Sequence, residues 1–72
     1  MAITQFQLRG EHIALCDLLK LTGIADSGGQ GKVMVSDGIV QVDGSIETRR
    51  TAKIRPGQVV ECLGQKILVT AG

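Results

Sequence analysis

Apolar and polar positions alternate near the start of the chain. Between residues 3 and 8, Phe6 and Leu8 fall on one side of an extended backbone, and Gln5 and Gln7 fall on the other. A period of two residues is typical of a strand with one buried face. We therefore expect this segment to be a strand that pairs with a later one.

The spacing of apolar residues changes to that of a helix over residues 11–21. Positions three and four apart lie on one face of a helix, and the apolar stripe here consists of Leu15, Leu18 and Leu19. Gly23 can adopt the left-handed backbone conformation that often ends a helix, and Ile24 can pack back against it. The pattern predicts a first helix over residues 11–21.

Residues 27–38 carry two conflicting signals. Ser27 followed by Gln30 fits a capping box, in which both side chains satisfy free backbone N–H groups at the start of a helix. The residues that follow are poor helix formers, and each glycine costs about 1 kcal/mol relative to alanine inside a helix. They are Gly28, Gly29, Gly31, Val33 and Val35. Propensity alone predicts a glycine loop and then a strand.

A tight hairpin is indicated in the middle of the chain. Residues 39–42 and 45–48 are separated by Asp43-Gly44. A two-residue turn of type I′ requires positive φ at both central residues, and Asp-Gly tolerates this. These segments are predicted to form two antiparallel strands.

Two further turns divide the last third of the chain. Pro56-Gly57 has the composition of a β-turn, and Gly64-Gln65 separates residues 59–63 from residues 66–70, which have the composition of a strand pair. The predicted fold class is α+β, with two short helices packed on a small, mostly antiparallel β-sheet. A chain of 72 residues can form a single domain, residues 1–72, with one modest core.

The motifs between these elements resemble those of a known family. They are Ser-x-x-Gln-x-Lys from Ser27, Val-x-Val-Asp-Gly from Val40 and Lys-Ile-Arg-Pro-Gly-x-Val-Val-Glu from Lys53. Their order resembles the RNA-binding domain first named from small-subunit ribosomal protein S-four, the alpha-L motif, and in particular its small stand-alone bacterial members of the YbcJ type. The resemblance covers roughly residues 11–61. It implies a short second helix over about residues 28–37, with Lys32 pointing to solvent.

Charge is nearly balanced over the whole chain but not along it. The formal net charge of +1 gives no argument for a nucleic-acid partner. Residues 48–57 nevertheless contain four basic residues and no acidic one: Arg49, Arg50, Lys53 and Arg55. Such a run forms either a solvated strand or loop, or a local positive patch that can bind phosphates.

The resemblance implies that basic groups of the two helices and of the following loop meet on one surface that faces RNA. The matching positions are Lys20, Lys32, Arg49, Arg50, Lys53 and Arg55. Phe6 is the only aromatic residue of the chain, so a platform that stacks unpaired bases cannot be assembled. The expected partner is structured RNA, such as ribosomal, transfer or stem-loop RNA, contacted through its phosphates.

Residues typical of an active site or a metal site are not grouped in the sequence. A nucleotide-binding loop needs glycine six positions before its lysine, and Asp26 stands there relative to Lys32. The single histidine, His12, has no nucleophile placed beside it, and the carboxylates are scattered. Cys16 and Cys62 are far apart and without other ligands, which predicts two free, at least partly buried thiols. We expect no enzyme activity, no metal and no cofactor.

The sequence also bears on location and on alternative functions. Its apolar stretches are far shorter than the ~20 residues that span a bilayer, and its start lacks a signal pattern, so a cytoplasmic protein without a membrane or small-molecule partner is expected. One alternative is a ubiquitin-like β-grasp sulfur carrier activated at Gly72, although Ala71 replaces the first of its two terminal glycines. The other alternative is a protein-interaction module that does not touch RNA.

Overall fold

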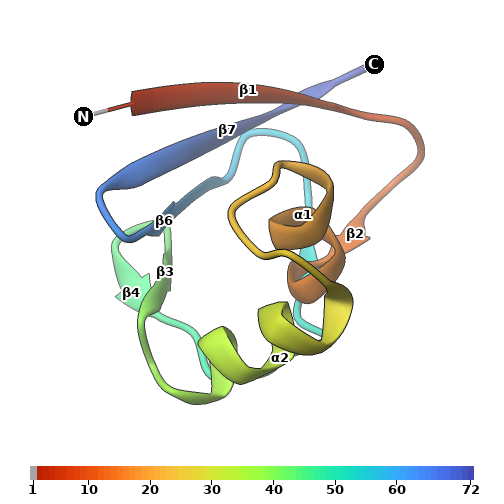
Figure 1. Cartoon of the computed structure of the whole chain (residues 1–72). Helices are drawn as coiled ribbons and strands as arrows, with labels where there is room; N and C mark the ends of the chain where they lie inside the picture. The colour runs from red at the N-terminus through yellow and green to blue at the C-terminus, as the bar shows by residue number, and fades with distance from the viewer. Residues whose placement is uncertain (1) are drawn as a thin grey trace.

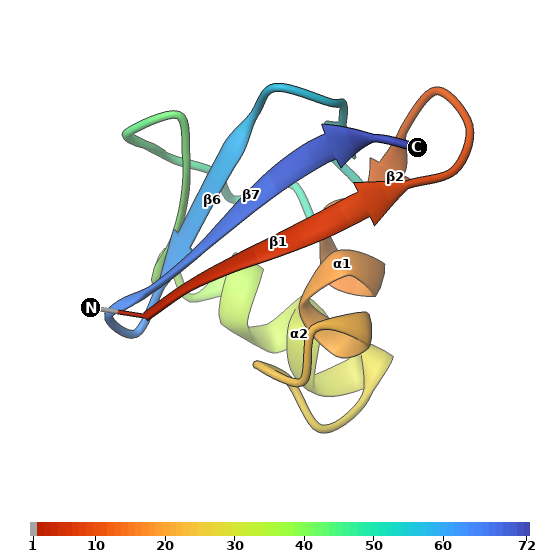
Figure 2. The same ribbon diagram turned by 90° about the horizontal axis from the view of Figure 1, so that it is seen from above.

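The chain forms a five-stranded sheet with two helices on one of its faces (Figures 1 and 2). The computed structural model describes residues 2–72. The strand order is β1 (Ala2–Leu8), β7 (Gln65–Ala71), β6 (Val59–Cys62), β3 (Val40–Val42) and β4 (Ser45–Ile46). β1 and β7 run parallel, and the other neighbours in this sheet run antiparallel. The predicted α+β fold, with a mostly antiparallel sheet, is confirmed.

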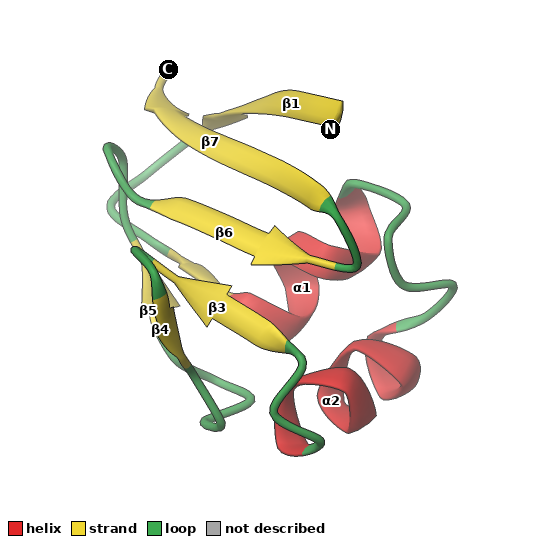
Figure 3. Ribbon diagram, turned by 90° about the vertical axis from the view of Figure 1, so that its left-hand side faces the viewer, coloured by secondary structure: helices red, strands yellow, loops and turns green. Residues whose placement is uncertain are grey.

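Alternate residues of the strands point toward the helices and form the core. The buried strand residues are Leu8, Val40, Val60, Cys62, Ile67 and Val69. They pack with the predicted leucine stripe of α1 (Leu15–Leu21) and with Met34 and Val35 of α2 (Gly28–Ser36). Because burial of one large aliphatic side chain stabilises a fold by about 1.5–3 kcal/mol, this contact between sheet and helices holds the two layers together (Figure 3).

β1 is the strand predicted from the alternating pattern. Leu8 is buried and Phe6 is half-buried, whereas Gln5 and Gln7 are exposed. The later strand with which it pairs is β7, in a register that places Phe6 opposite Val69.

α1 is shorter than the sequence predicted. It begins at Leu15 rather than at residue 11, because Ile13–Ala14 form strand β2, which pairs antiparallel with β5 (Lys53–Ile54). The end of the helix is as predicted. Gly23 has a φ of 81°, its amide donates to the Lys20 carbonyl at 3.1 Å, and Ile24 packs against the core.

α2 forms in spite of its glycines. The Ser27 hydroxyl accepts a hydrogen bond from the Gln30 amide at 3.1 Å, as the capping box predicts. The Gln30 side chain reaches back to the amide of Asp26, one residue before the expected one. Met34 and Val35 are buried on the core side. The helix implied by the family resemblance is confirmed, and the glycine loop and strand favoured by propensity are not formed.

The two helices meet at Gly31. A Cβ atom built on Gly31 would lie 2.8 Å from the carbonyl oxygen of Cys16 in α1, closer than real Cβ atoms approach an oxygen. The same atom on Gly29 would meet only the Ser27 hydroxyl, at 3.8 Å, and on Gly28 it would meet nothing within 4 Å. Close helix packing therefore explains the glycine at position 31 but not those at positions 28 and 29.

The predicted hairpin between β3 and β4 is confirmed, although β4 ends two residues earlier than expected. Asp43 and Gly44 both have positive φ, of 51° and 84°. The Asp43 carboxylate accepts hydrogen bonds from the Val59 amide at 3.0 Å and from the Gln58 side chain at 3.2 Å. These bonds lower the pKa of Asp43 and attach the turn to β6.

Of the two later turns, one is confirmed and one is displaced. At Pro56-Gly57, Gly57 has a φ of 93° and the Gln58 amide donates to the Arg55 carbonyl at 3.2 Å. The last turn consists of Leu63 and Gly64, with φ of 52° and 76°, and not of Gly64-Gln65. The register of β6 with β7 pairs Cys62 with Gln65 and leaves Leu63 and Gly64 as the turn. This register is fixed because β6 also pairs with β3 and β7 also pairs with β1. A leucine therefore stands where turn composition favours glycine.

Both cysteines are free and buried, as predicted. Burial raises the pKa of the Cys62 thiol. Within residues 2–72, no group of three histidine, cysteine or acidic side chains lies where it could hold a metal ion. Over the same residues, no helix is long and apolar enough to cross a membrane.

Replacing Gly31 by alanine tests the contact between the helices. The added methyl group must push against the Cys16 carbonyl, so we expect Gly31→Ala to lower the free energy of unfolding by about 1–3 kcal/mol. Gly29→Ala is the matched control, because its methyl group has space and alanine is the better helix former by up to about 1 kcal/mol. Urea unfolding of both variants measures the difference, and equal stabilities would contradict the contact.

The last turn makes a second prediction about stability. A leucine in the left-handed region costs about 1–2 kcal/mol, and Leu63 recovers little of this by burial because it is 68% exposed. Asparagine tolerates positive φ better, so Leu63→Asn should raise the free energy of unfolding by about 1 kcal/mol. A variant less stable than the wild type in thermal unfolding would show that Leu63 has another role.

Candidate nucleic-acid interface

A four-residue turn, residues 49–52, attaches the basic segment to the start of α1. The Ala52 amide donates to the Arg49 carbonyl at 3.1 Å and closes the turn. The first two amides of α1 donate hydrogen bonds to carbonyls of this turn. Leu15 donates to the Ala52 carbonyl at 2.9 Å, and Cys16 donates to the Arg50 carbonyl at 3.2 Å. Because the first amides of a helix lack partners within the helix, this turn serves as the cap of α1.

The same corner of the molecule lies beside α2. Gly31 contacts Cys16, and the next residue, Lys32, is exposed as the family resemblance implied. A surface depression of about 450 Å³ lies between α2 and the turn. Its lining residues are Lys32, Thr48, Arg49, Arg50 and Thr51. The contact between the helices thus brings a lysine of α2 next to the arginines of the turn.

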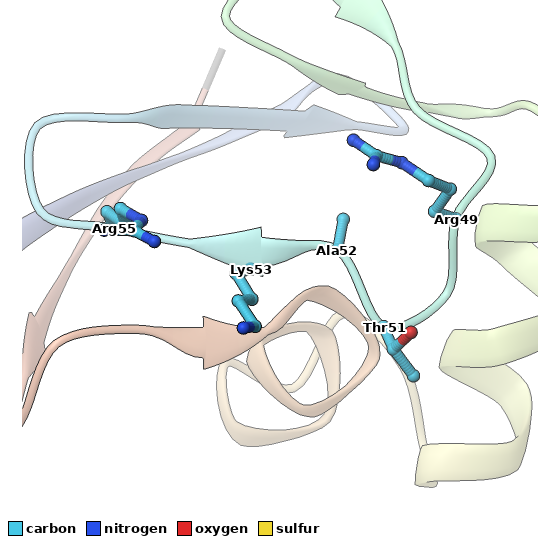
Figure 4. Close-up of a pocket in the computed structure, with 5 residues that line it drawn as sticks. All are labelled: Arg49, Thr51, Ala52, Lys53 and Arg55. Carbon is cyan, nitrogen blue, oxygen red and sulfur yellow. The ribbon is translucent and has the colours of Figure 1, made fainter.

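A second depression, of about 330 Å³, continues from the turn along β5 (Figure 4). Its lining residues are Arg49, Thr51, Ala52, Lys53 and Arg55. Arg49 and Thr51 line both depressions. Figure 4 shows the side chains of Arg49, Lys53 and Arg55 leaving the chain in different directions. Positive charges spread in this way suit an extended polyanion better than one small ligand.

Five of the six predicted site residues therefore line the two depressions. The sixth, Lys20, lines neither of them. It is exposed in the last turn of α1, five residues after Leu15 and about 7.5 Å further along the helix axis.

Arg49 is held by an acidic neighbour. Its Nη2 donates to Glu47 Oε1 at 3.0 Å, and its Nε and its backbone amide donate to Glu47 Oε2 at 3.2 Å and 3.0 Å. The Arg49 side chain is 79% exposed and that of Glu47 19%. The side-chain hydrogen bonds lower the pKa of Glu47 and raise the pKa of Arg49. Of the five N–H donors of a guanidinium, these side-chain bonds use two, so donors remain for an anion.

Three residues of this region were missed by sequence reasoning. Glu47 lies one residue before the basic run, and its spacing of two from Arg49 places both on one side of an extended backbone. That spacing was a usable signal. Thr48 and Thr51 line the depressions, and nothing in the sequence distinguishes them from the other threonines.

The family model of the S4 domain matches residues 6–70. The chain belongs to the S4 domain family. The predicted family is thereby confirmed, and both depressions lie within the part of the chain that matches the S4 domain.

Relatives of this S4 domain include the protein named "Putative RNA-binding protein YbcJ" in Escherichia coli (strain K12). It is 48% identical over 60 residues, which are 83% of this chain and 86% of the relative. The "Uncharacterized protein YbcJ" of Shigella flexneri has the same identity and coverage.

Two solved structures resemble the S4 domain. The solution structure of YbcJ from E. coli, described as showing an alpha-L motif involved in RNA binding, has a TM-score of 0.70 and 44% identity, covering 99% of this chain and 89% of that one. The 30S ribosomal protein S4e of Thermoplasma acidophilum has a TM-score of 0.61 and 21% identity. It covers 81% of this chain and 31% of that one, and it shows a shared fold.

The pairing of Glu47 with Arg49 makes a prediction about pH. Because the pairing lowers the pKa of Glu47, its contribution to stability is present above the ordinary glutamate pKa and is lost as pH falls through the lower pKa of the folded state. Arg49→Gln should return the pKa of Glu47 toward its ordinary value. NMR titration of the Glu47 carboxyl carbon measures this, with Arg50→Gln as the control that leaves the pKa unchanged. Equal titrations in the two variants would contradict the pairing.

Proposed function

We propose that this S4 domain binds structured RNA through its phosphates. The observation that carries the proposal is a pair of adjacent depressions, one between α2 and the turn and the other along the turn and β5. Their basic lining residues are Lys32, Arg49, Arg50, Lys53 and Arg55, and none of the described residues that line them is acidic. Phosphate groups are the natural ligands of such a surface, because lysine and arginine neutralise their charge and arginine can bind them through two N–H groups.

The relatives support RNA as the source of these phosphates. The E. coli relative is named for RNA binding, and its solution structure is described as showing a motif involved in RNA binding. We extend this ligand to the present chain because the basic side chains lie on the S4 domain itself. Ribosomal, transfer and stem-loop RNA, which are cytoplasmic in bacteria, are the candidate partners.

The scarcity of aromatic side chains favours a duplex over an unpaired strand. Phe6, the only aromatic residue, is half-buried in β1. Proteins that bind single strands stack bases on exposed aromatic rings, which this surface does not offer. The proposed contacts are therefore with the backbone of a helical RNA. Lys20, which lies outside the depressions, is proposed to reach a phosphate further along the same RNA.

The contacts of Gly72 weigh against the sulfur-carrier alternative. A carrier of that type presents its terminal glycine on an extended, free tail to an activating enzyme. Here the Gly72 amide donates to the Leu8 carbonyl at 2.9 Å and extends the pairing of β7 with β1. A Cβ atom on Gly72 would lie 2.8 Å from the same carbonyl. The backbone of Gly72 is thus paired with β1 and is not free.

The salt dependence of binding tests the proposal. Each neutralised phosphate contributes a slope of about −0.9 to a log–log plot of affinity against salt, so four or five contacts should give a slope of about −4. Arg49→Ala combined with Arg50→Ala should flatten this slope by about two and should weaken binding similarly for RNAs of different sequence. Fluorescence anisotropy with a labelled RNA hairpin over a range of KCl concentrations measures both effects.

The matched control removes two basic residues that line neither depression, Arg9 and Lys66. Changing both to alanine should leave the slope near that of the wild type. Surface charges and surface ion pairs, such as those of Arg49 with Glu47 and of Lys66 with Glu61, contribute little to stability, so circular dichroism should show both double variants to be folded. A folded Arg49/Arg50 variant with unchanged affinity and slope would contradict the assignment. Copurification of a protein partner that persists after nuclease treatment would favour the protein-interaction alternative.

A further inference from the structure

We propose that the two depressions hold two phosphates of the same RNA strand, and that the hydroxyl groups of Thr48 and Thr51 are uncharged hydrogen-bond donors to these phosphates. This inference rests on the proposed function. The two depressions share Arg49 and Thr51 as lining residues, so they are immediate neighbours. A phosphate in each one would lie beside the same arginine and the same threonine. One continuous strand can supply both groups.

The charged groups alone leave the position of each phosphate undefined. Each depression is lined by three cations, more than the single negative charge of a phosphodiester requires. Lysine and arginine side chains are long and exposed, and lysine acts mainly as a point charge. Short side chains, whose donor oxygen lies close to the backbone, add direction to such a site. Among the lining residues, only Thr48 and Thr51 have hydroxyl groups.

The hydroxyl groups of these two threonines are available to a ligand. Both residues are exposed. Two of the other three threonines use their hydroxyls inside the fold: Thr22 donates to the Leu18 carbonyl at 2.8 Å, and Thr70 to the Phe6 carbonyl at 3.4 Å. Within the part of the chain that the structure describes, the hydroxyls of Thr48 and Thr51 have no such bond.

Thr51 is also held in place before any ligand arrives. The carbonyls on both sides of it, those of Arg50 and Ala52, accept hydrogen bonds from the first two amides of α1. The other shared residue, Arg49, is held by Glu47. Figure 4 shows Thr51 directed toward α2 and Arg49 away from it, so that the turn offers donors on both of its sides. Donors positioned in advance lose little conformational entropy when they bind.

A neutral donor should change affinity without changing the salt dependence. It binds a phosphate oxygen but displaces no condensed counterion, whereas a lysine or arginine does both. Thr51→Val removes the hydroxyl and keeps the charge and nearly the shape of the side chain. The loss of one such hydrogen bond should weaken binding roughly threefold to tenfold. Thr48→Val should have a similar effect, because each hydroxyl supplies one donor.

The probe is a fluorescently labelled RNA hairpin with a stem of one helical turn, titrated at several KCl concentrations. The variants are Thr51→Val, Thr48→Val and Thr51→Ser, and the matched control is Thr4→Val, an exposed threonine of β1 outside both depressions. We expect Thr51→Val to lose affinity with the slope of the wild type. Thr51→Ser, which restores a hydroxyl, should bind within about twofold of the wild type, because the hydrogen bond is kept.

Two results would overturn the hydroxyl contacts and leave the proposed function standing. One is a Thr51→Val variant that binds as tightly as the Thr4→Val control while the wild type keeps its steep slope. The other is a Thr51→Ser variant that binds as weakly as Thr51→Val, which would make the methyl group, rather than the hydroxyl, the important part. Wild-type protein that does not bind the hairpin, or binds it without salt dependence, would overturn the proposed function and this inference together.

Discussion

The backbone of Cys16 is the point at which the two helices and the basic turn meet. Its amide donates to the Arg50 carbonyl at 3.2 Å, and its carbonyl oxygen faces Gly31 at a distance that leaves no space for a side chain. Both contacts use the main chain, whose position is set by the buried leucines of α1. A shift of this residue's backbone would move Lys32 relative to the arginines of the turn. The arrangement of charges on the surface thus depends on a contact in the interior.

The candidate interface combines a hydrogen-bonded backbone with exposed charged groups. The turn is anchored by helix amides, whereas the lysine and arginine side chains extend into solvent. Exposed ion pairs contribute little to stability, so the value of Glu47 lies in orienting Arg49 rather than in holding the fold. Phosphate backbones of different sequence have the same charge spacing, and a surface of this kind can bind many of them. Specificity for one RNA would then come from the shape of its helix.

Local signals in the sequence conflicted over α2, and the outcome shows how they combine. Each glycine of α2 has a low helix propensity. The Ser27 cap, the burial of Met34 and Val35 and the close approach at Gly31 together outweigh this unfavourable propensity. The late start of α1 and the position of the last turn result instead from pairing between strands. Ile13–Ala14 follow a helical pattern but pair with β5, and Leu63 accepts an unfavourable φ because its two strands also pair with others. Both predictions, the start of the first helix and the position of the last turn, were wrong because they did not include pairing between distant segments.

The sequence by itself determined the strand β1, the leucine stripe, the cap of α2 and the turns at Asp43-Gly44 and Pro56-Gly57, because each depends on residues a few positions apart. The order of its motifs also indicated the family and the basic residues to consider. Only the tertiary structure decided which of them share a surface. Lys32, residues 48–53 and Arg55 come together on one surface, and Lys20 is left outside the depressions, because backbone contacts between distant segments set these positions.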